Sequence, residues 1–325
     1  MTLDFGGDED LQALVEDVQL FQGAGYYNPD NGTESLIASL QGQLYKFTIV
    51  GDTATVTDIS IPGDPNSTAE RQAWLWQSEK WMIVQNGLNI PIFYDGTTSV
   101  RSNWNVPQPF STTTSAQFTI PAVGAQATVA FTSVTDLLVG DIITFKNKGT
   151  AIVLVIAGLN VTFVSTDMTP VGQDITAGRI VSWQHIGAQL PPGRMGTYGL
   201  GRNWLSLTDG KQFVAGDIVG GSSGTVAENY RDAVLNITEN LYLAGGGNFT
   251  VPGSVGDIRA MRFGATLDAS LGQGPLQVFT PDTVFSVNAP VDRTIWQNVQ
   301  NPILTESLIS NGALSQWSTV LANGD

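Results

Sequence analysis

Apolar and polar positions alternate with a period of two along most of the chain from Leu36 onward. A degenerate unit recurs within this pattern: an apolar strand, a turn that carries Gly or Asp, and a second apolar strand. Such a unit predicts a β-hairpin, because side chains of a strand point alternately to its two faces and Gly and Asp favour tight turns. We expect hairpins over residues 36–49, 81–95, 204–218, 241–251 and 276–288.

The spacing of these hairpins indicates a repeat. Equivalent positions of the five hairpins are Ile37, Ile83, Leu205, Leu241 and Gln277. They are separated by 46, 122, 36 and 36 residues, and leaving out residues 111–183 shortens the second interval to 49. Hairpin units at this period are typical of β-propeller blades, and the remaining 252 residues would make five or six blades. A sandwich or a chain of several barrels is the alternative, since any all-β sequence contains hairpins at irregular spacing.

Residues 111–183 differ from the rest in being denser in β-branched residues and continuously strand-like. We expect them to form an independent small β-barrel or sandwich domain inserted in the body. The predicted fold class is therefore all-β. It comprises an acidic N-terminal arm at residues 1–35, a propeller-like body at 36–110 and 184–325, and the insertion at 111–183.

The first 34 residues carry eight acidic residues and no Lys or Arg. Leu11, Leu14, Val15 and Val18 have helical spacing behind an acidic start that suits the helix dipole, which predicts a short helix. A solvated leader without a helix is the alternative. The acidic residues are Asp4, Asp8, Glu9, Asp10, Glu16, Asp17, Asp30 and Glu34.

The whole chain has a net charge of −15. That sign argues against a protein that grips nucleic acid by neutralising phosphates, and it would favour sliding past DNA. The chain has no cysteine, and no stretch approaches the ~20 apolar residues of a membrane span. The acidic start is the reverse of a basic signal peptide, so we expect a soluble protein made in the cytoplasm.

The last residues, 314–325 (LSQWSTVLANGD), predict a strand that runs into an Asn-Gly-Asp turn without a second strand. An unpaired apolar edge invites association with another strand. We therefore expect a partner strand from the N-terminal segment, from a neighbouring subunit or from a continuation of the native chain.

Few residues offer catalytic or ligand-binding chemistry. His185 is the single histidine, and without cysteine neither the usual zinc sites nor a Cys–His nucleophile can form. The glycine-rich residues 220–224 and 245–247 lack the Walker lysine. Asp209 and Asp282 could belong to a glycosidase carboxylate pair, but Asp is favoured at such turns for its turn-forming hydrogen bonds alone. The sequence thus predicts no catalytic, cofactor-binding or metal site, and no enzyme.

Arginines gather in the second half of the body, which could complement the acidic arm of another subunit. Ordinary surface ion pairs are the alternative. The predicted inter-subunit contacts are Asp8, Glu9, Asp10, Arg194, Arg202, Arg259, Arg262 and Arg293.

Residues 258–288 (IRAMRFGATLDASLGQGPLQVFTPDTVFSVN) resemble the tail nozzle proteins of short-tailed phages, also called tail tubular protein B. The unit at residues 204–218 (WLSLTDGKQFVAGDI) fits the same pattern. The insertion, with FTIPAVGAQATVAFTSVTDLLVGDIITF, is similar to small β modules that recur in phage tail and fibre proteins.

The resemblance implies a structural component of the virion tail: a ring, most often of six subunits, attached below the tail adaptor protein and passing the genomic DNA through a channel without binding it specifically. Tail fibres are a further candidate partner, and no cofactor is implied. A glycan-binding or glycan-cleaving tail propeller and a tail-fibre or decoration protein are the alternatives.

Overall fold

The computed structural model describes residues 20–29, 32–220, 232–238, 247–264, 274–290, 292–298, 304–309 and 311–319. Over these residues the chain forms antiparallel β-sheets joined by turns and short 3₁₀ helices, and none of the sheets closes as a barrel. The prediction of an all-β fold is confirmed. The described part contains no helix that is both long and apolar enough to cross a membrane.

The chain divides into two compact units. The described residues of the insert unit are Trp104–Gly187, and the four-sheet unit contains the described residues before Trp104 and from Ala188 onward. Within the four-sheet unit a reciprocal pair joins the two ends of the chain that flank the insert. The backbone N–H of Asn103 donates to Gln189 Oε1 at 2.8 Å, and that of Gln189 donates to Asn103 Oδ1 at 3.1 Å. The insertion expected at 111–183 falls inside the insert unit.

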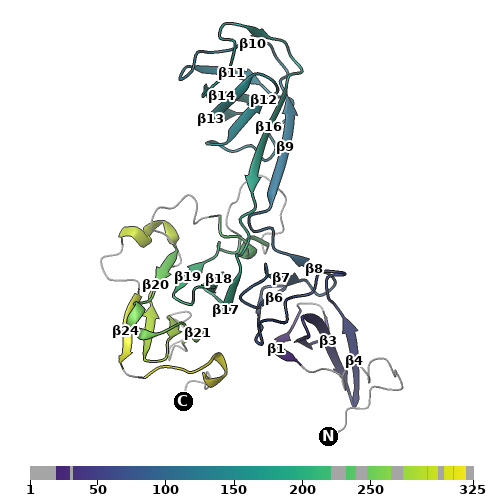
Figure 1. The fold of residues 1–325 in the computed structure, drawn as a ribbon, viewed down its shortest axis with the longest axis vertical. Coiled ribbons are helices and arrows are strands. Elements are labelled where there is room, and N and C mark those ends of the chain that lie inside the picture. Colours follow the sequence, from purple (N-terminus) through teal and green to yellow (C-terminus); the bar gives the residue numbers. More distant parts are fainter. Residues whose placement is uncertain are drawn as a thin grey trace. The chain divides into compact units, whose positions relative to one another are not determined.

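The four-sheet unit contains four sheets of four antiparallel strands, each in sequence order (Figure 1). The first is β1 (Phe21–Tyr27), β2 (Ser35–Leu40), β3 (Gln43–Val50) and β4 (Thr53–Asp58). The second is β5 (Trp74–Ser78), β6 (Trp81–Gln85), β7 (Ile92–Tyr94) and β8 (Ser99–Arg101). The third is β17 (Gly193–Gly199), β18 (Arg202–Leu207), β19 (Gln212–Ala215) and β20 (Asn248–Thr250). The fourth is β21 (Ala260–Phe263), β22 (Leu276–Phe279), β23 (Thr283–Val287) and β24 (Leu304–Ile309).

Four of the five expected hairpins are confirmed, as β2–β3, β6–β7, β18–β19 and β22–β23. Ile37, Ile83, Leu205 and Gln277 each lie on the second strand of one sheet, whereas Leu241 lies outside the described residues. The repeated unit is thus a four-stranded meander. The described residues hold four such sheets, fewer than the five or six expected from the length of the chain and the period of the repeat.

The first strands of successive sheets contact one another, β1 with β5, β5 with β17, and β17 with β21. Glycines permit this approach. A Cβ at Gly196 of β17 would lie 2.5 Å from Trp76 Cζ2 of β5, and one at Gly199 would collide with the ring of Phe263 of β21. A Cβ at Gly23 of β1 would likewise collide with the carbonyl of Ala73, which precedes β5. Close contact between neighbouring sheets therefore depends on single residues that lack a side chain.

Two clusters of buried side chains, one mainly aliphatic and one aromatic, pack between the sheets. Tyr27, Ile37, Leu44, Met82 and Val84 are almost fully buried in one apolar cluster shared by the first and second sheets. An aromatic cluster in the third sheet contacts the fourth through the ring pair of Trp204 and Phe263. Its other ring pairs are Trp204 with Phe249, Phe213 with Phe249, and Trp204 with Trp296 of a 3₁₀ helix.

A buried polar network links the second and third sheets. Asn203 of β18 is fully buried, and its Oδ1 accepts hydrogen bonds from Trp76 Nε1 at 2.9 Å and from the Ser78 hydroxyl. Its Nδ2 donates to the carbonyl of Val234 at 2.7 Å, in the 3₁₀ helix η1 (Asp232–Leu235). One amide therefore connects three separate segments of the chain.

The insert unit contains a six-stranded antiparallel sheet in the order β11-β14-β13-β12-β16-β9 and the two-stranded sheet β10-β15. An isolated bridge between Thr114 and Phe131 connects the ends of the two edge strands. Rings of Phe118, Phe131, Phe145 and Phe163 pack in its core. Its strands are β9 (Pro107–Thr113), β10 (Phe118–Thr119), β11 (Gln126–Ala130), β12 (Ile142–Phe145), β13 (Gly149–Ala157), β14 (Asn160–Ser165), β15 (Asp174–Ile175) and β16 (Ile180–Ile186).

Two terminal predictions differ from the structure. Part of the expected arm, residues 21–27, forms β1, and Tyr27 is fully buried in the shared core of the first two sheets. The strand expected from residue 314 is replaced by the 3₁₀ helix η5 (Gln316–Ser318). The reason is local: Ser315 and Ser318 form a capping box, whose hydrogen bonds favour a helical turn. Residues 1–19 and 320–325 lie outside the described residues.

Candidate functional site

A pocket of about 350 Å³ lies where the first strands of three sheets begin. Trp74 is the first residue of β5, Arg194 is the second of β17, and Arg259 directly precedes β21. Gln316 of η5 lines the same pocket. The meander topology thus places the starts of strands from three sheets, and the segment that carries η5, around one cavity.

Two residues that line this pocket each carry a buried polar atom without a hydrogen-bond partner in the described part of the chain: Trp74 Nε1 and Gln316 Oε1. Trp74 as a residue is 7% exposed. The indole N–H can only donate and the amide oxygen can only accept. A buried unpaired polar group costs about 1–3 kcal/mol, so a ligand that supplied an acceptor to Trp74 and a donor to Gln316 would recover that cost.

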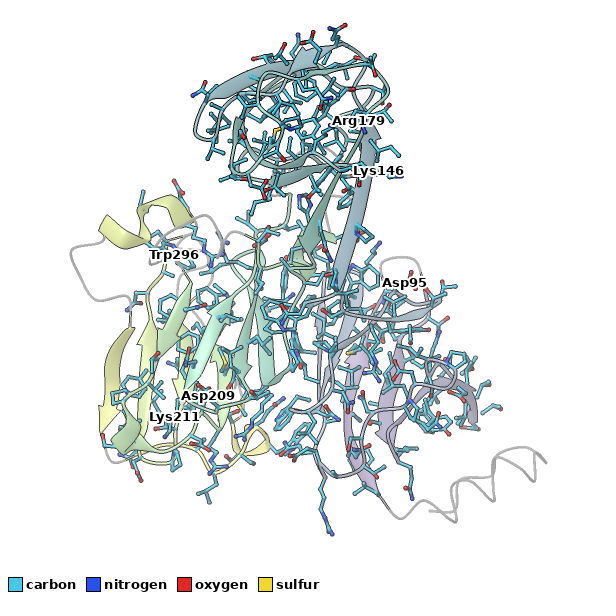
Figure 2. All side chains as sticks on the ribbon, turned by 45° about the horizontal axis from the view of Figure 1, so that its top comes forward. Asp95, Lys146, Arg179, Asp209, Lys211 and Trp296 are labelled. Atoms are coloured by element: carbon cyan, nitrogen blue, oxygen red, sulfur yellow. The ribbon has the colours of Figure 1, made fainter. Side chains whose placement is uncertain are left out.

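Arg194 brings positive charge to the pocket. Its Nη1 lies 3.6 Å from Asp257 Oδ2, and Lys211 Nζ lies 3.3 Å from Asp257 Oδ1. Lys211 follows the Asp209 turn between β18 and β19, and Figure 2 shows these two side chains close together. One carboxylate therefore faces two cations, and the guanidinium retains unshared donor atoms.

Arg259 is a second cation of the pocket. Its side chain is exposed and forms no ion pair with the residues that the structure describes. Its backbone N–H donates to the carbonyl of Phe279 at 2.7 Å, which holds the start of β21 against β22. Glu70 adds one carboxylate to the lining. The charged residues that line the pocket are thus two arginines, Arg194 and Arg259, and one carboxylate, Glu70, although the chain as a whole is acidic.

Two of the predicted contact residues are not on the surface of the four-sheet unit. Arg202 is 1% exposed and Arg293 is 4% exposed, and each donates to the carbonyl of Gly216. Their guanidinium carbons lie 5.3 and 5.2 Å from the ring centre of Trp296, which is labelled in Figure 2. Both arginines are buried in the interior of the four-sheet unit, and the expectation that they contact a neighbouring subunit was wrong.

The remaining predicted residues fall in three places. Arg194 and Arg259 meet in the pocket, whereas Arg262 lines a separate, smaller hollow and its Nε donates to Thr319 Oγ1 at 2.8 Å. The acidic partners Asp8, Glu9 and Asp10 lie outside the described residues. Their pairing with the arginines stays a prediction.

Other chemistry is accounted for by local structure. His185 Nε2 lies 2.8 Å from Asp141 Oδ2 inside the insert unit, and its ring packs on Phe110. Asp209 Oδ1 accepts from the backbone N–H groups of Lys211 and Gln212, as expected of a turn former. Within the described ranges no group of three or more His, Asp or Glu could hold a metal ion.

Sequence reasoning missed Trp74 and Gln316 as members of a site. Trp74 was one of eight tryptophans, and packing is the usual use of this residue in an all-β chain. Gln316 lies more than 240 residues from Trp74 in the sequence, so no local motif could connect them. No family model matches the chain, and no curated protein matches it.

Proposed function

We propose that this chain is a structural component of a phage tail, the nozzle subunit of a ring, most often of six copies, that joins the tail adaptor and lets DNA pass. The resemblance of residues 204–218 and 258–288 to tail nozzle proteins suggests this function. A propeller-like arrangement of the four sheets is part of the proposal, supported by the successive contacts of β1, β5, β17 and β21. The net charge of −15 supports a wall past which DNA slides.

The observation that carries the proposal of an assembly is an apolar row on the outer face of the first sheet. Register pairs Tyr26 with Leu36, Leu36 with Phe47, and Phe47 with Val56, so these four side chains share one face. Tyr26 and Leu36 are 57% and 43% exposed, although their neighbours Tyr27 and Ile37 are fully buried on the opposite face.

A contiguous apolar face of this kind is typical of an interface between proteins. Ile49, 66% exposed on the same face of β3, extends it. A second copy of this chain is the occupant that a ring requires, because a heterologous ring contact joins two different patches of identical subunits.

The test is assembly of the purified full-length chain, measured by mass photometry and analytical ultracentrifugation. We expect the wild-type protein to form closed rings and Leu36→Lys to remain monomeric, because a charge would be buried in the contact. Leu159→Lys is the matched control: Leu159 is 51% exposed in the insert unit, and this variant should assemble normally.

Electron microscopy of virions labelled at the insert unit tests the location. We expect density for the label around the tail axis. Density in threefold spikes away from the axis would assign the chain to a fibre, and a wild-type chain that stays monomeric both alone and with the adaptor would contradict the ring.

A further inference from the structure

We propose that the pocket at the starts of β5, β17 and β21 binds a carboxylate of an acidic protein segment, and that its occupant is the N-terminal segment, residues 8–17, of a second copy of this chain. The proposal rests on the proposed function in one respect: an assembly brings the two copies together. It assigns a binding partner to a pocket defined by Trp74, Arg194, Arg259 and Gln316.

The donors of the pocket determine the chemistry of the ligand. Arg194, Arg259 and the buried Trp74 Nε1 offer only hydrogen-bond donors, and two of them are charged. A carboxylate accepts from all three groups, and guanidinium–carboxylate hydrogen bonds are shorter and stronger than neutral ones. Arg194 and Lys211 already share Asp257, whereas Arg259 has no carboxylate among the described residues, so the pocket has room for one more anion.

Gln316 favours a peptide over an isolated anion. Its buried Oε1 needs a donor, which a simple carboxylate does not have. An acidic segment of a polypeptide offers both groups, because a backbone N–H lies within a few ångströms of each side-chain carboxylate. A volume of about 350 Å³ accommodates one or two residues of such a segment.

The distribution of charge along the sequence indicates which acidic segment binds the pocket. Residues 8–17 (DEDLQALVED) contain five carboxylates and no cation, and no Lys or Arg occurs anywhere in the first 34 residues. The lining of the pocket carries one more cation than anions in a chain of net charge −15, so this segment and the two arginines are complementary in sign.

The experiment measures binding of a fluorescent peptide of residues 1–19 to the full-length chain by anisotropy. The chain carries Asp8→Asn, Glu9→Gln, Asp10→Asn, Glu16→Gln and Asp17→Asn, so that its own segment does not compete. We expect saturable binding that weakens as salt rises. Arg259→Gln and Trp74→Phe should each weaken it about tenfold or more, the second because it removes the indole N–H while keeping an aromatic ring. Lys146→Gln, which removes an exposed cation of the insert unit, should leave it unchanged.

Three results would overturn the inference: equal binding of a peptide with all its carboxylates changed to amides, no loss in Arg259→Gln, or glucuronate or sialic acid binding more tightly than the peptide. The last result would assign the pocket to an acidic sugar. The peptide is added in trans, so its binding does not require ring formation. The wild-type chain could form rings that are lost in Leu36→Lys and yet fail to bind the peptide. That pair of results would refute this inference and leave the proposed function intact. Peptide binding by a chain that never assembles would support the pocket and refute the ring.

Discussion

Asn203→Ala should destabilise the four-sheet unit more than almost any other single polar substitution in it. Asn203 is 0% exposed and forms three side-chain hydrogen bonds, with Trp76 Nε1, the Ser78 hydroxyl and the Val234 carbonyl. Alanine removes all three. The indole N–H and the Val234 carbonyl are then left buried without partners, whereas the Ser78 hydroxyl can rotate.

The expected magnitude follows from those two groups. Each buried unpaired donor or acceptor costs about 1–3 kcal/mol, and the cavity left by the amide adds a smaller amount, so the loss in free energy of unfolding should be roughly 3–5 kcal/mol. This is a large share of the ~5–15 kcal/mol that stabilises a typical domain. Asn203→Asp keeps the acceptor oxygens and loses the donor to Val234, and it should still be destabilising because it buries a charge.

Urea unfolding followed by tryptophan fluorescence is the assay, because Trp76 reports directly on the network. Asn248→Ala is the matched control: Asn248 is exposed on β20 of the same third sheet, and its substitution should change the free energy of unfolding by less than about 0.5 kcal/mol. An Asn203→Ala protein within 1 kcal/mol of wild type would refute the reasoning that this amide holds the second and third sheets together.

Two further predictions concern packing and pH. Gly196→Val should lower the stability of the four-sheet unit by at least about 1–3 kcal/mol, since its Cβ would lie 2.5 Å from Trp76 Cζ2, and thermal unfolding that matches wild type would contradict it. Burial, and then the nearby Tyr94 and Asp95, raise the pKa of Tyr27 to about 12, above the ~10 of an unfolded tyrosine. Its contribution, about 2–3 kcal/mol, is complete below pH ~10 and is lost as pH rises toward 12. Unfolding by urea at pH 8–12 should show a shallower alkaline decline in Tyr27→Phe, and identical declines in the two proteins would refute this role.

Turns and hairpins could be predicted from the sequence because their causes are local. The alternation at residues 36–49 and the Asp-Gly turn at residues 209–210 act within a few neighbours, and both hairpins form as expected. Residues 21–27 were assigned to an arm because the first 34 residues carry eight acidic residues and no Lys or Arg. The tertiary structure reverses this, since Gly23 and Gly25 are required where β1 meets Ala73 and Leu75.

The predicted contact residues also show what the sequence can and cannot predict. The sequence places these arginines in the second half of the chain, but it does not distinguish Arg259, which is exposed, from Arg202 and Arg293, which are buried. The two buried arginines both contact the Gly216 carbonyl and Trp296, although Arg293 and Gly216 are 77 positions apart in the sequence.

By itself, then, the sequence determined the all-β class and four of the five expected hairpins. Only the tertiary structure decided that the repeat is a four-stranded sheet and that Trp74, Arg194, Arg259 and Gln316 line one pocket. The physical reason is range: alternation and turn chemistry act between neighbours in the chain, whereas burial and hydrogen-bond partners depend on contacts between segments that folding alone brings together.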